Sequence, residues 1–375
     1  MRIELITGML RKLLPAAVFA LTLAGLSFPS GGATSTATAA ESNGTLVFEP
    51  ASGSTSAKHI VFIAGDEEYR SEESMPMLAK ILSGKHGFRC SVVFSMGPDG
   101  ADYIDPNNQQ GLRGLQALES ADLMIIGTRF RHPSPEQAAF VTAYLNSGKP
   151  VIGIRTATHA FQGGEKFGDN LTYGEFGLKI LGEQWVSHHG NHKVEGARGV
   201  IVPGAESHPV LNSVKDVFAP SDVYGVVNLT DKDQILLRGA ITKTLDPESE
   251  ILKDKRNDPM QPFAWLHTYS SPDGKCEGRS FCTTAGAAVD FVSEDLRRLI
   301  VNAAYFLTDQ DVPQKADVDY VDPFFPSFYG FIGDKSYWKG HNLKPEDFGP
   351  GKSPVLPDAP GSPEWKFRPM PPQGR

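Results

Sequence analysis

Short, largely apolar runs recur through the first half of the chain. They cover residues 59–64, 88–94, 123–126 and 150–154 and are rich in β-branched side chains. Each is only four to seven residues long, and the first and third end at a glycine. A short apolar run bounded in this way is typical of a strand that is buried on both faces, so the pattern predicts four buried strands.

Segments with apolar residues at helical spacing lie between and after these runs. The pattern predicts helices at 75–82, 112–118, 135–145 and 296–307, the third with Pro135 in its first turn. Apolar strands that alternate with helices require a sheet covered on both faces. We therefore predict an α/β fold, doubly wound, with a mostly parallel sheet and helices on both faces.

The second half of the domain is less regular. Strands are predicted near 199–202 and 235–237, and the segments 263–267 and 279–283 are predicted to pair around a turn. After residue 312 the chain becomes rich in proline, glycine and aromatic residues. We expect an extended arm packed on the domain surface up to residue 340 and Pro-rich disorder from about residue 349.

The N-terminal segment has the order of a secretory signal peptide. Three basic residues precede an apolar run over 13–28, and Ala37-Thr38-Ala39 follows. The run is about 16 residues long, shorter than the ~20 that span a bilayer. We expect cleavage after Ala39 or Ala40 and a periplasmic or secreted protein with no stable membrane span. The predicted organisation is a signal peptide at 1–39, a flexible lead at 40–57, one domain at 58–311 and a C-terminal extension at 312–375.

Composition and charge exclude several partners. The formal net charge is −8 and no basic cluster is present, which argues against nucleic acid as a partner. Neither G-x-G-x-x-G nor a P-loop follows the first predicted strand, so we expect no NAD and no ATP. A homo-oligomer is compatible with the sequence.

The three cysteines allow two interpretations. Cys276 and Cys282 flank Glu277-Gly278-Arg279, interpreted as a turn, and could form a disulfide in an oxidising compartment or remain two thiols. Cys90 lies in an apolar run and is expected in the core.

Charged residues gather where three predicted strands end. The segment 65–70 follows the first strand, Arg129 the third, and Arg155 and His159 the fourth. Because ligands bind beyond the carboxyl ends of parallel strands, we expect these residues to share one crevice. A solvated turn would give the same acidic pattern at 66–68.

Several of these segments resemble the ThuA-like (trehalose-utilisation) family of the class I glutamine-amidotransferase-like superfamily. The matching stretches are GDEEYR at 65–70, GIRTATHAF at 153–161, SDVYGV at 221–226, FAWLHTY at 263–269 and RRLIVNAAYF at 297–306. The resemblance spans roughly residues 58–311. It implies a flavodoxin-like sheet and a role in bacterial use of trehalose and related sugars, with a small carbohydrate as the partner.

The chain departs from this pattern at two positions. In the amidotransferases a cysteine follows the Gly-Ile of the nucleophile-elbow strand, and typical ThuA-like members have histidine there, whereas this chain has Arg155. Gly286-Ala287 stands where the family has Gly-His, so no histidine role is carried to either position. Because a guanidinium stays protonated and cannot attack a carbonyl, we expect no glutaminase activity.

Three residues are the predicted catalytic set. Arg155 would steady developing negative charge, and His159 or Glu67 would move a proton. His159 follows Arg155 by about one helical turn and has a side chain that titrates near neutral pH. Alternatively, Arg155 pairs with Glu67 or Glu68 and holds two strands together, and His159 is a hydrogen-bonded structural residue.

The segment 187–192 contains three histidines and permits a metal hypothesis. A divalent metal such as zinc would be held by His188, His192 and an acid such as Glu67. The alternative is a polar sugar-binding loop, in which Trp185 offers an aromatic face. The predicted substrate-binding residues are Glu68, Tyr69, Arg70, Arg129, Trp185, His189, Asp222 and Tyr224. Asp222 and Tyr224 would equally suit a turn and a packed core position.

Taken together, these features predict an exported enzyme of carbohydrate catabolism that acts on a sugar or an oxidised sugar by acid–base chemistry. The first alternative is a non-catalytic carbohydrate-binding module on the same fold. A further alternative is a surface protein whose aromatic C-terminal segment is an interaction arm.

Overall fold

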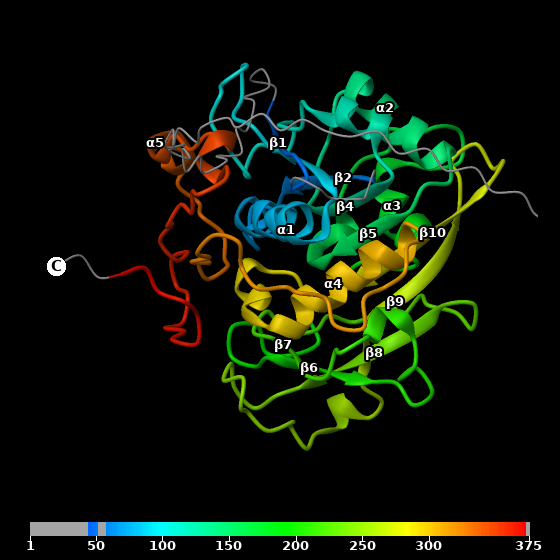
Figure 1. The fold of residues 1–375 in the computed structure, drawn as a ribbon, viewed down its shortest axis with the longest axis vertical. Coiled ribbons are helices and arrows are strands. Elements are labelled where there is room, and N and C mark those ends of the chain that lie inside the picture. The colour runs from blue at the N-terminus through cyan, green and yellow to red at the C-terminus, as the bar shows by residue number, and fades with distance from the viewer. Residues whose placement is uncertain (1–43, 52–57, 373–375) are drawn as a thin grey trace, which may run out of the picture. The chain divides into compact units, whose positions relative to one another are not determined.

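The computed structural model describes residues 44–51 and 58–372 (Figure 1). The predicted signal peptide lies outside the described residues. The strands are β1 (Thr45–Phe48), β2 (His59–Gly65), β3 (Arg89–Phe94), β4 (Leu123–Thr128), β5 (Val151–Ile154), β6 (Ala197–Ile201), β7 (Val217–Ala219), β8 (Gln234–Ile241), β9 (Gln261–Ser270) and β10 (Glu277–Thr283). The α-helices are α1 (Ser71–His86), α2 (Pro135–Asn146), α3 (Phe176–Leu181), α4 (Glu294–Leu307) and α5 (Tyr337–His341). The 3₁₀ helices are η1 (Leu115–Ser120), η2 (Arg155–His159), η3 (Tyr173–Glu175), η4 (Pro209–Leu211), η5 (Lys255–Asn257), η6 (Ala288–Val292) and η7 (Pro345–Phe348).

All ten strands belong to one sheet in the order β1-β3-β2-β4-β5-β10-β9-β8-β6-β7. The five strands from β3 to β10 in this order run parallel, and the strands on either side of them are antiparallel to their neighbours. The chain passes from β2 to β3 on one side and then returns to β4 on the other. The order therefore reverses between β2 and β4, which is where a doubly wound sheet opens a crevice for ligands.

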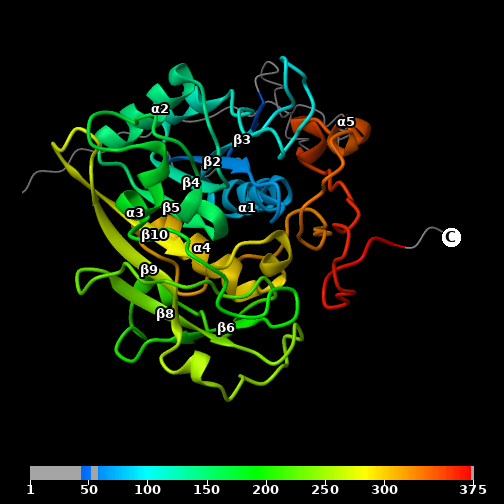
Figure 2. The same ribbon diagram turned by 180° about the vertical axis from the view of Figure 1, so that it is seen from behind.

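The buried strands divide their side chains between two cores. Ile60, Phe62 and Ala64 of β2 pack into the core with α1 and α4, whereas Val61 and Ile63 pack into the core with α2 and α3. Figures 1 and 2 show these helix pairs on opposite faces of the sheet. Successive residues of a strand point to opposite faces, so a strand that is apolar at every position must be covered on both. The predicted fold class is confirmed.

Local departures from the predicted elements have simple causes. The segment 112–118 forms only the short η1, at 115–120, because Gly111 and Gly114 interrupt it. Part of the expected flexible lead forms β1, which covers the edge of β3. No helix in the described ranges has the length and apolar character of a membrane span.

The cysteines do not form the disulfide that was one of two interpretations of their spacing. Cys276 is half-buried and Cys282 is buried, and both are free thiols. Residues 277–279, interpreted as a turn, belong to β10, so the two cysteines lie at opposite ends of one extended segment. At about 3.3 Å per residue, six residues separate them by roughly 20 Å, too far for a bond between sulfurs.

The C-terminal extension packs against the domain along most of its length (Figure 1). This agrees with the expected arm over 312–340, but the disorder expected from residue 349 is not observed up to residue 372. Leu356, Ala359 and Trp365 are buried. The indole Nε1 of Trp365 also donates a hydrogen bond to the carbonyl oxygen of Leu245 at 2.8 Å.

Candidate functional site

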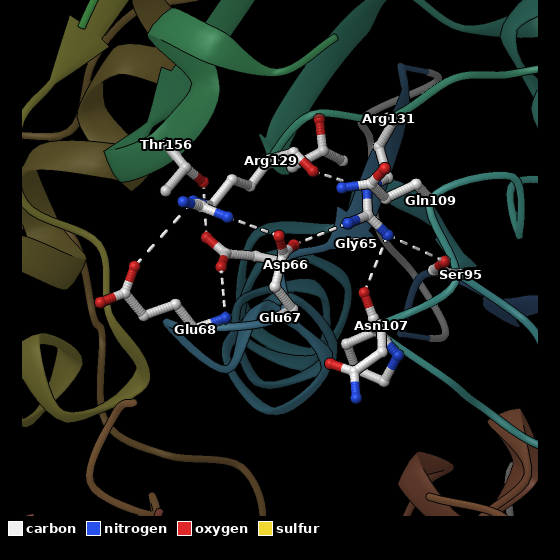
Figure 3. Close-up of polar contacts among 12 residues, drawn as sticks. Gly65, Asp66, Glu67, Glu68, Ser95, Asn107, Gln109, Arg129, Arg131 and Thr156 are labelled. Carbon is white, nitrogen blue, oxygen red and sulfur yellow. Dashed lines mark hydrogen bonds and ion pairs between the residues drawn. The ribbon is translucent and has the colours of Figure 1, made fainter. Parts of the chain in front are cut away.

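The ends of β2, β4 and β5 lie side by side, as predicted, because these strands are neighbours in the sheet. Asp66 links two of these ends (Figure 3). Its carboxylate accepts hydrogen bonds from the Thr156 hydroxyl at 2.5 Å and from the backbone N–H groups of Glu68 and Tyr69 at 2.8 and 3.0 Å. Burial and the nearby Glu67 charge raise the pKa of Asp66 to about 6.

Arg155 occupies a sharp turn directly after β5. Its φ of 49° is in the left-handed region, and η2 starts at this residue, so the strained strand-to-helix elbow that the resemblance implied is present. The guanidinium is almost completely buried. It donates to the Tyr69 hydroxyl at 3.0 Å and to the Thr284 carbonyl at 2.9 Å. It also donates to Asp222 through the carboxylate Oδ1 at 3.0 Å and the carbonyl oxygen at 3.1 Å.

Asp222 is the ionic partner of Arg155, in place of the Glu67 or Glu68 considered from the sequence. Its second oxygen, Oδ2, lies 3.2 Å from His188 Nδ1 and 2.9 Å from His192 Nδ1. Burial alone would raise the pKa of Asp222, but the Arg155 charge and the two histidine hydrogen bonds lower it to about 2. The carboxylate therefore stays ionised and joins one cation to two imidazoles.

The two histidines on Asp222 have different surroundings. Their ring centroids are 4.2 Å apart. His192 Nε2 lies 3.4 Å from the Glu68 carboxylate. Burial lowers the pKa of His192, but the hydrogen bond to Asp222 and the nearby Glu68 carboxylate outweigh it and leave the pKa raised. His188 is more exposed and lines the cavity described next.

A cavity of about 100 Å³ opens beside this cluster. Its walls come from the loops after β2, β4 and β5, from the segment 185–188 and from the C-terminal extension. The lining residues are Glu68, Tyr69, Arg129, Arg155, Thr156, His159, Trp185, His188, Tyr224 and Phe331. Most of the predicted site residues therefore meet in one place, with Asp222 and His192 directly behind the wall.

His159 lines the cavity but has the wrong electrostatics for the predicted proton transfer. Its ring lies between Phe130 and Trp185, with centroid distances of 5.0 and 5.2 Å. Burial, together with the Arg129 and Arg155 charges, lowers the pKa of His159 to about 3. The imidazole is thus neutral at physiological pH and a weak base.

Glu67 is held by two arginines and belongs neither to the cavity lining nor to the group of possible metal ligands, so the structure does not bring it together with Arg155 and His159 as predicted. Figure 3 shows its carboxylate between two guanidinium groups at the end of β4. Its oxygens lie 2.5 Å from Arg129 Nη1 and 2.6 Å from Arg131 Nη2, and Arg131 is fully buried. The buried cation turns Glu67 toward β4, while the next residue, Glu68, faces the cavity.

Two predicted substrate-binding residues also lie elsewhere. Arg70 is buried at the start of α1, 3.8 Å from the Glu72 carboxylate and with its guanidinium 5.4 Å from the Trp338 ring centroid. His189 Nε2 contacts the carbonyl oxygen of Arg256 at 2.7 Å. His188 thus faces the cavity and His189 faces Arg256, a difference that the spacing of the histidines alone could not show.

Phe331 and Thr156 line the cavity but were not predicted. Thr156 follows the elbow arginine directly, and its position after a strand was the available signal. Phe331 lies far along the chain, within an aromatic-rich segment whose composition indicated packing but no particular place.

No family model and no curated protein matches the sequence. Among solved structures, the chain is similar to a protein described as ThuA-like from Bacteroides uniformis, with 13% identity and a TM-score of 0.43 over 68% of this chain and 92% of the other. A second protein described as ThuA-like, from Parabacteroides merdae, has 14% sequence identity and a TM-score of 0.41, over 70% of this chain and 94% of the other. The glutaminase domain of a Trypanosoma brucei CTPS has 11% sequence identity and a TM-score of 0.31, over 69% of this chain and 98% of the other.

Proposed function

We propose that this protein binds a sugar or oxidised sugar in the cavity at the ends of β2, β4 and β5 and acts on it by acid–base chemistry. The observation that carries the proposal is a chain of contacts in which Arg155 holds Asp222 and Asp222 holds His188 at the cavity wall. Trp185 supplies an aromatic face to the same cavity. An aromatic face with a few placed polar groups suits a ligand that has both apolar ring faces and hydroxyls.

His188 is the residue we propose to move the proton. Its Nδ1 faces Asp222, which leaves Nε2 as the nitrogen that can exchange a proton with a ligand. A buried carboxylate that holds one imidazole nitrogen fixes the ring orientation and stabilises the protonated form. His188 therefore takes the role that the sequence suggested for His159 or Glu67.

Arg155 acts in this proposal as a positioning residue. Its nitrogens Nη1 and Nη2 donate four hydrogen bonds, to Tyr69, Asp222 and Thr284. Both nitrogens are therefore already engaged within the protein. The arginine keeps Asp222 ionised and in place. Arg129, which is partly exposed and also lines the cavity, is the cation better placed to meet a ligand oxygen.

A metal-dependent version is favoured by a specific observation. His188, His192 and Asp222 each offer a ligand atom, and these atoms lie within 4.8 Å of one another. Two imidazoles and a carboxylate suit zinc and similar divalent ions, and Asp222 takes the place of the Glu67 expected from the sequence. Arg155 would hold the other carboxylate oxygen as an outer contact. When bound, such an ion would polarise a ligand oxygen and lower the pKa of a bound water.

The proposal extends to the cellular location. The signal-peptide pattern of residues 1–39 supports an activity in the periplasm or outside the cell.

Two adjacent histidines provide the test. A panel of sugars and keto-glycosides would be screened by thermal shift and by turnover, because a ligand that binds only the native state raises its stability. We expect His188→Ala to lower turnover at least ~100-fold and His189→Ala, which changes the neighbour that faces Arg256, to leave it nearly unchanged. Equal behaviour of the two variants, or no binding by the wild type, would contradict the proposal.

Chelation separates the two chemical versions. Turnover that is lost with a chelator and restored by zinc would support the metal, whereas turnover that survives chelation would support His188 and Asp222 alone. Saturable binding of an unchanged sugar would instead identify a carbohydrate-binding module.

A further inference from the structure

The C-terminal extension reaches the candidate site through residues 327–331. The backbone N–H of Gly330 donates to the Glu68 carbonyl at 2.8 Å, which fastens the extension to the loop after β2. Ser327 donates from its N–H and its hydroxyl to Glu73 at 2.8 and 2.5 Å. The stretch is therefore attached on both sides of Phe328 and Tyr329, and Phe331 follows the second attachment directly.

Tyr329 packs against the residues that hold the proposed proton-transfer group. Its ring lies 5.1 Å from that of Tyr69 and 5.0 Å from that of His192. Its hydroxyl donates to the Pro220 carbonyl at 3.1 Å. Because Tyr69 accepts from Arg155, the extension supports the same network from outside the domain.

Phe331 differs from the other aromatic residues of the chain. It is 51% exposed, which makes it the most exposed Phe, Tyr or Trp residue within residues 44–51 and 58–372. It nevertheless lines the cavity, where the Arg129 guanidinium lies 4.9 Å from its ring centroid. An aromatic ring left in water at the rim of a polar cavity is typical of a ligand contact.

The size of the cavity indicates which part of a ligand this ring would meet. Pockets that enclose a whole drug-sized ligand usually measure ~300–1,000 Å³. A cavity of about 100 Å³ would therefore enclose no more than about one sugar ring of a larger ligand. A substituent on that ring would project past the rim, where Phe331 lies. Trp185 and His188, which also line the cavity, would meet the first ring.

We infer that the C-terminal extension forms the outer wall of the binding site and that Phe331 contacts the substituent that a bound sugar projects from the cavity. This inference rests on the proposed function and adds to it a specificity-determining residue. It assigns to the extension a role in ligand selection, in place of the separate interaction arm that the sequence also allowed.

A pair of glycosides tests the inference. The sugar that stabilises the wild type in the thermal screen would be used as its methyl and its phenyl glycoside, and dissociation constants would be measured by calorimetry. We expect Phe331→Ala to weaken the phenyl glycoside about tenfold, the usual size of an aromatic stacking contact, and to change the methyl glycoside less than twofold. Phe331→Tyr should restore the phenyl glycoside.

The matched control is Val355→Ala. Val355 belongs to the same extension and is equally exposed, at 52%, but lies outside the cavity lining. Phenyl-glycoside affinity that is equal in wild type and Phe331→Ala, or lowered as much by Val355→Ala, would overturn the inference while the proposed function stands. Failure of the wild type to bind any sugar would overturn both.

Discussion

Glu72 provides a test of how burial at the start of α1 shifts the pKa of a carboxyl group. The side chain is 2% exposed, and neither carboxylate oxygen has a hydrogen-bond partner among the described residues. Arg70 Nη1, 3.8 Å away, is its ionic contact, and Glu73 and Asp66 are further acids close enough to act on it. From the extension, Tyr337 faces the same charges. Burial raises the pKa of Glu72 to about 8, with Arg70 opposing the shift.

A raised pKa in the folded state has a defined consequence for stability. The pKa of an unfolded glutamate is about 4.3, so the folded protein holds a proton that the unfolded chain releases between that value and about 8. The stabilisation is fully present below the unfolded pKa and is lost as the pH rises through the folded one. At 1.36 kcal/mol per pKa unit, the roughly three units between pH 5 and the folded pKa of about 8 correspond to a loss on the order of 4 kcal/mol from this group.

Glu72→Gln removes the titration while it keeps the shape of the side chain. Urea unfolding of wild type and variant at pH 5, 6, 7, 8 and 9 would give the difference in unfolding free energy at each pH, in which groups that do not interact with Glu72 cancel. We expect the wild type to lose unfolding free energy relative to the variant as the pH rises. Glu119→Gln, at an exposed position, is the matched control and should show no trend. A constant difference for Glu72→Gln from pH 5 to 9 would refute the reasoning.

Two further substitutions test the packing around the site and the extension. Gly286 has a φ of 144°, and a Cβ there would lie 1.8 Å from Ile154 Cγ2, so Gly286→Ala should lower the unfolding free energy by at least ~2 kcal/mol in urea titrations. Gly333→Ala, which meets open space, should change it little, and equal effects would contradict the steric argument. Trp365→Ala should cost roughly 3–5 kcal/mol, because the indole is buried and bonded to Leu245. An unchanged unfolding midpoint would show that the end of the extension contributes nothing to stability.

The fold was predictable where a local pattern has a single structural solution. A strand whose residues 60–64 are all apolar must be covered on both faces, and neighbouring strands joined by helices are expected to run parallel. The convergence of the residues after β2, β4 and β5 followed from this geometry. The disorder expected after residue 349 was wrong for the opposite reason. Composition describes local preference, whereas Trp365 is fixed by contacts with residues about 120 positions away.

Within the site, the residue types were predictable but their partners were not. Glu67 and Glu68 are adjacent and chemically alike, yet buried Arg131 engages one and leaves the other at the cavity. His188 and His189 differ in the same way. Such choices depend on side-chain directions in irregular loops, which no periodicity encodes.

Arg155 shows how the elbow can serve a site without a nucleophile. A left-handed residue costs of order 1 kcal/mol or more, and an unpaired buried guanidinium costs further free energy, so both persist only where surrounding contacts offset them. Asp222, Tyr69 and Thr284 provide these contacts, and Asp222 in turn holds two histidines. The strain at the elbow is therefore linked to the placement of His188 at the cavity. In the proposed function the arginine shapes the site, and the imidazoles that its partner carboxylate orients would carry the chemistry.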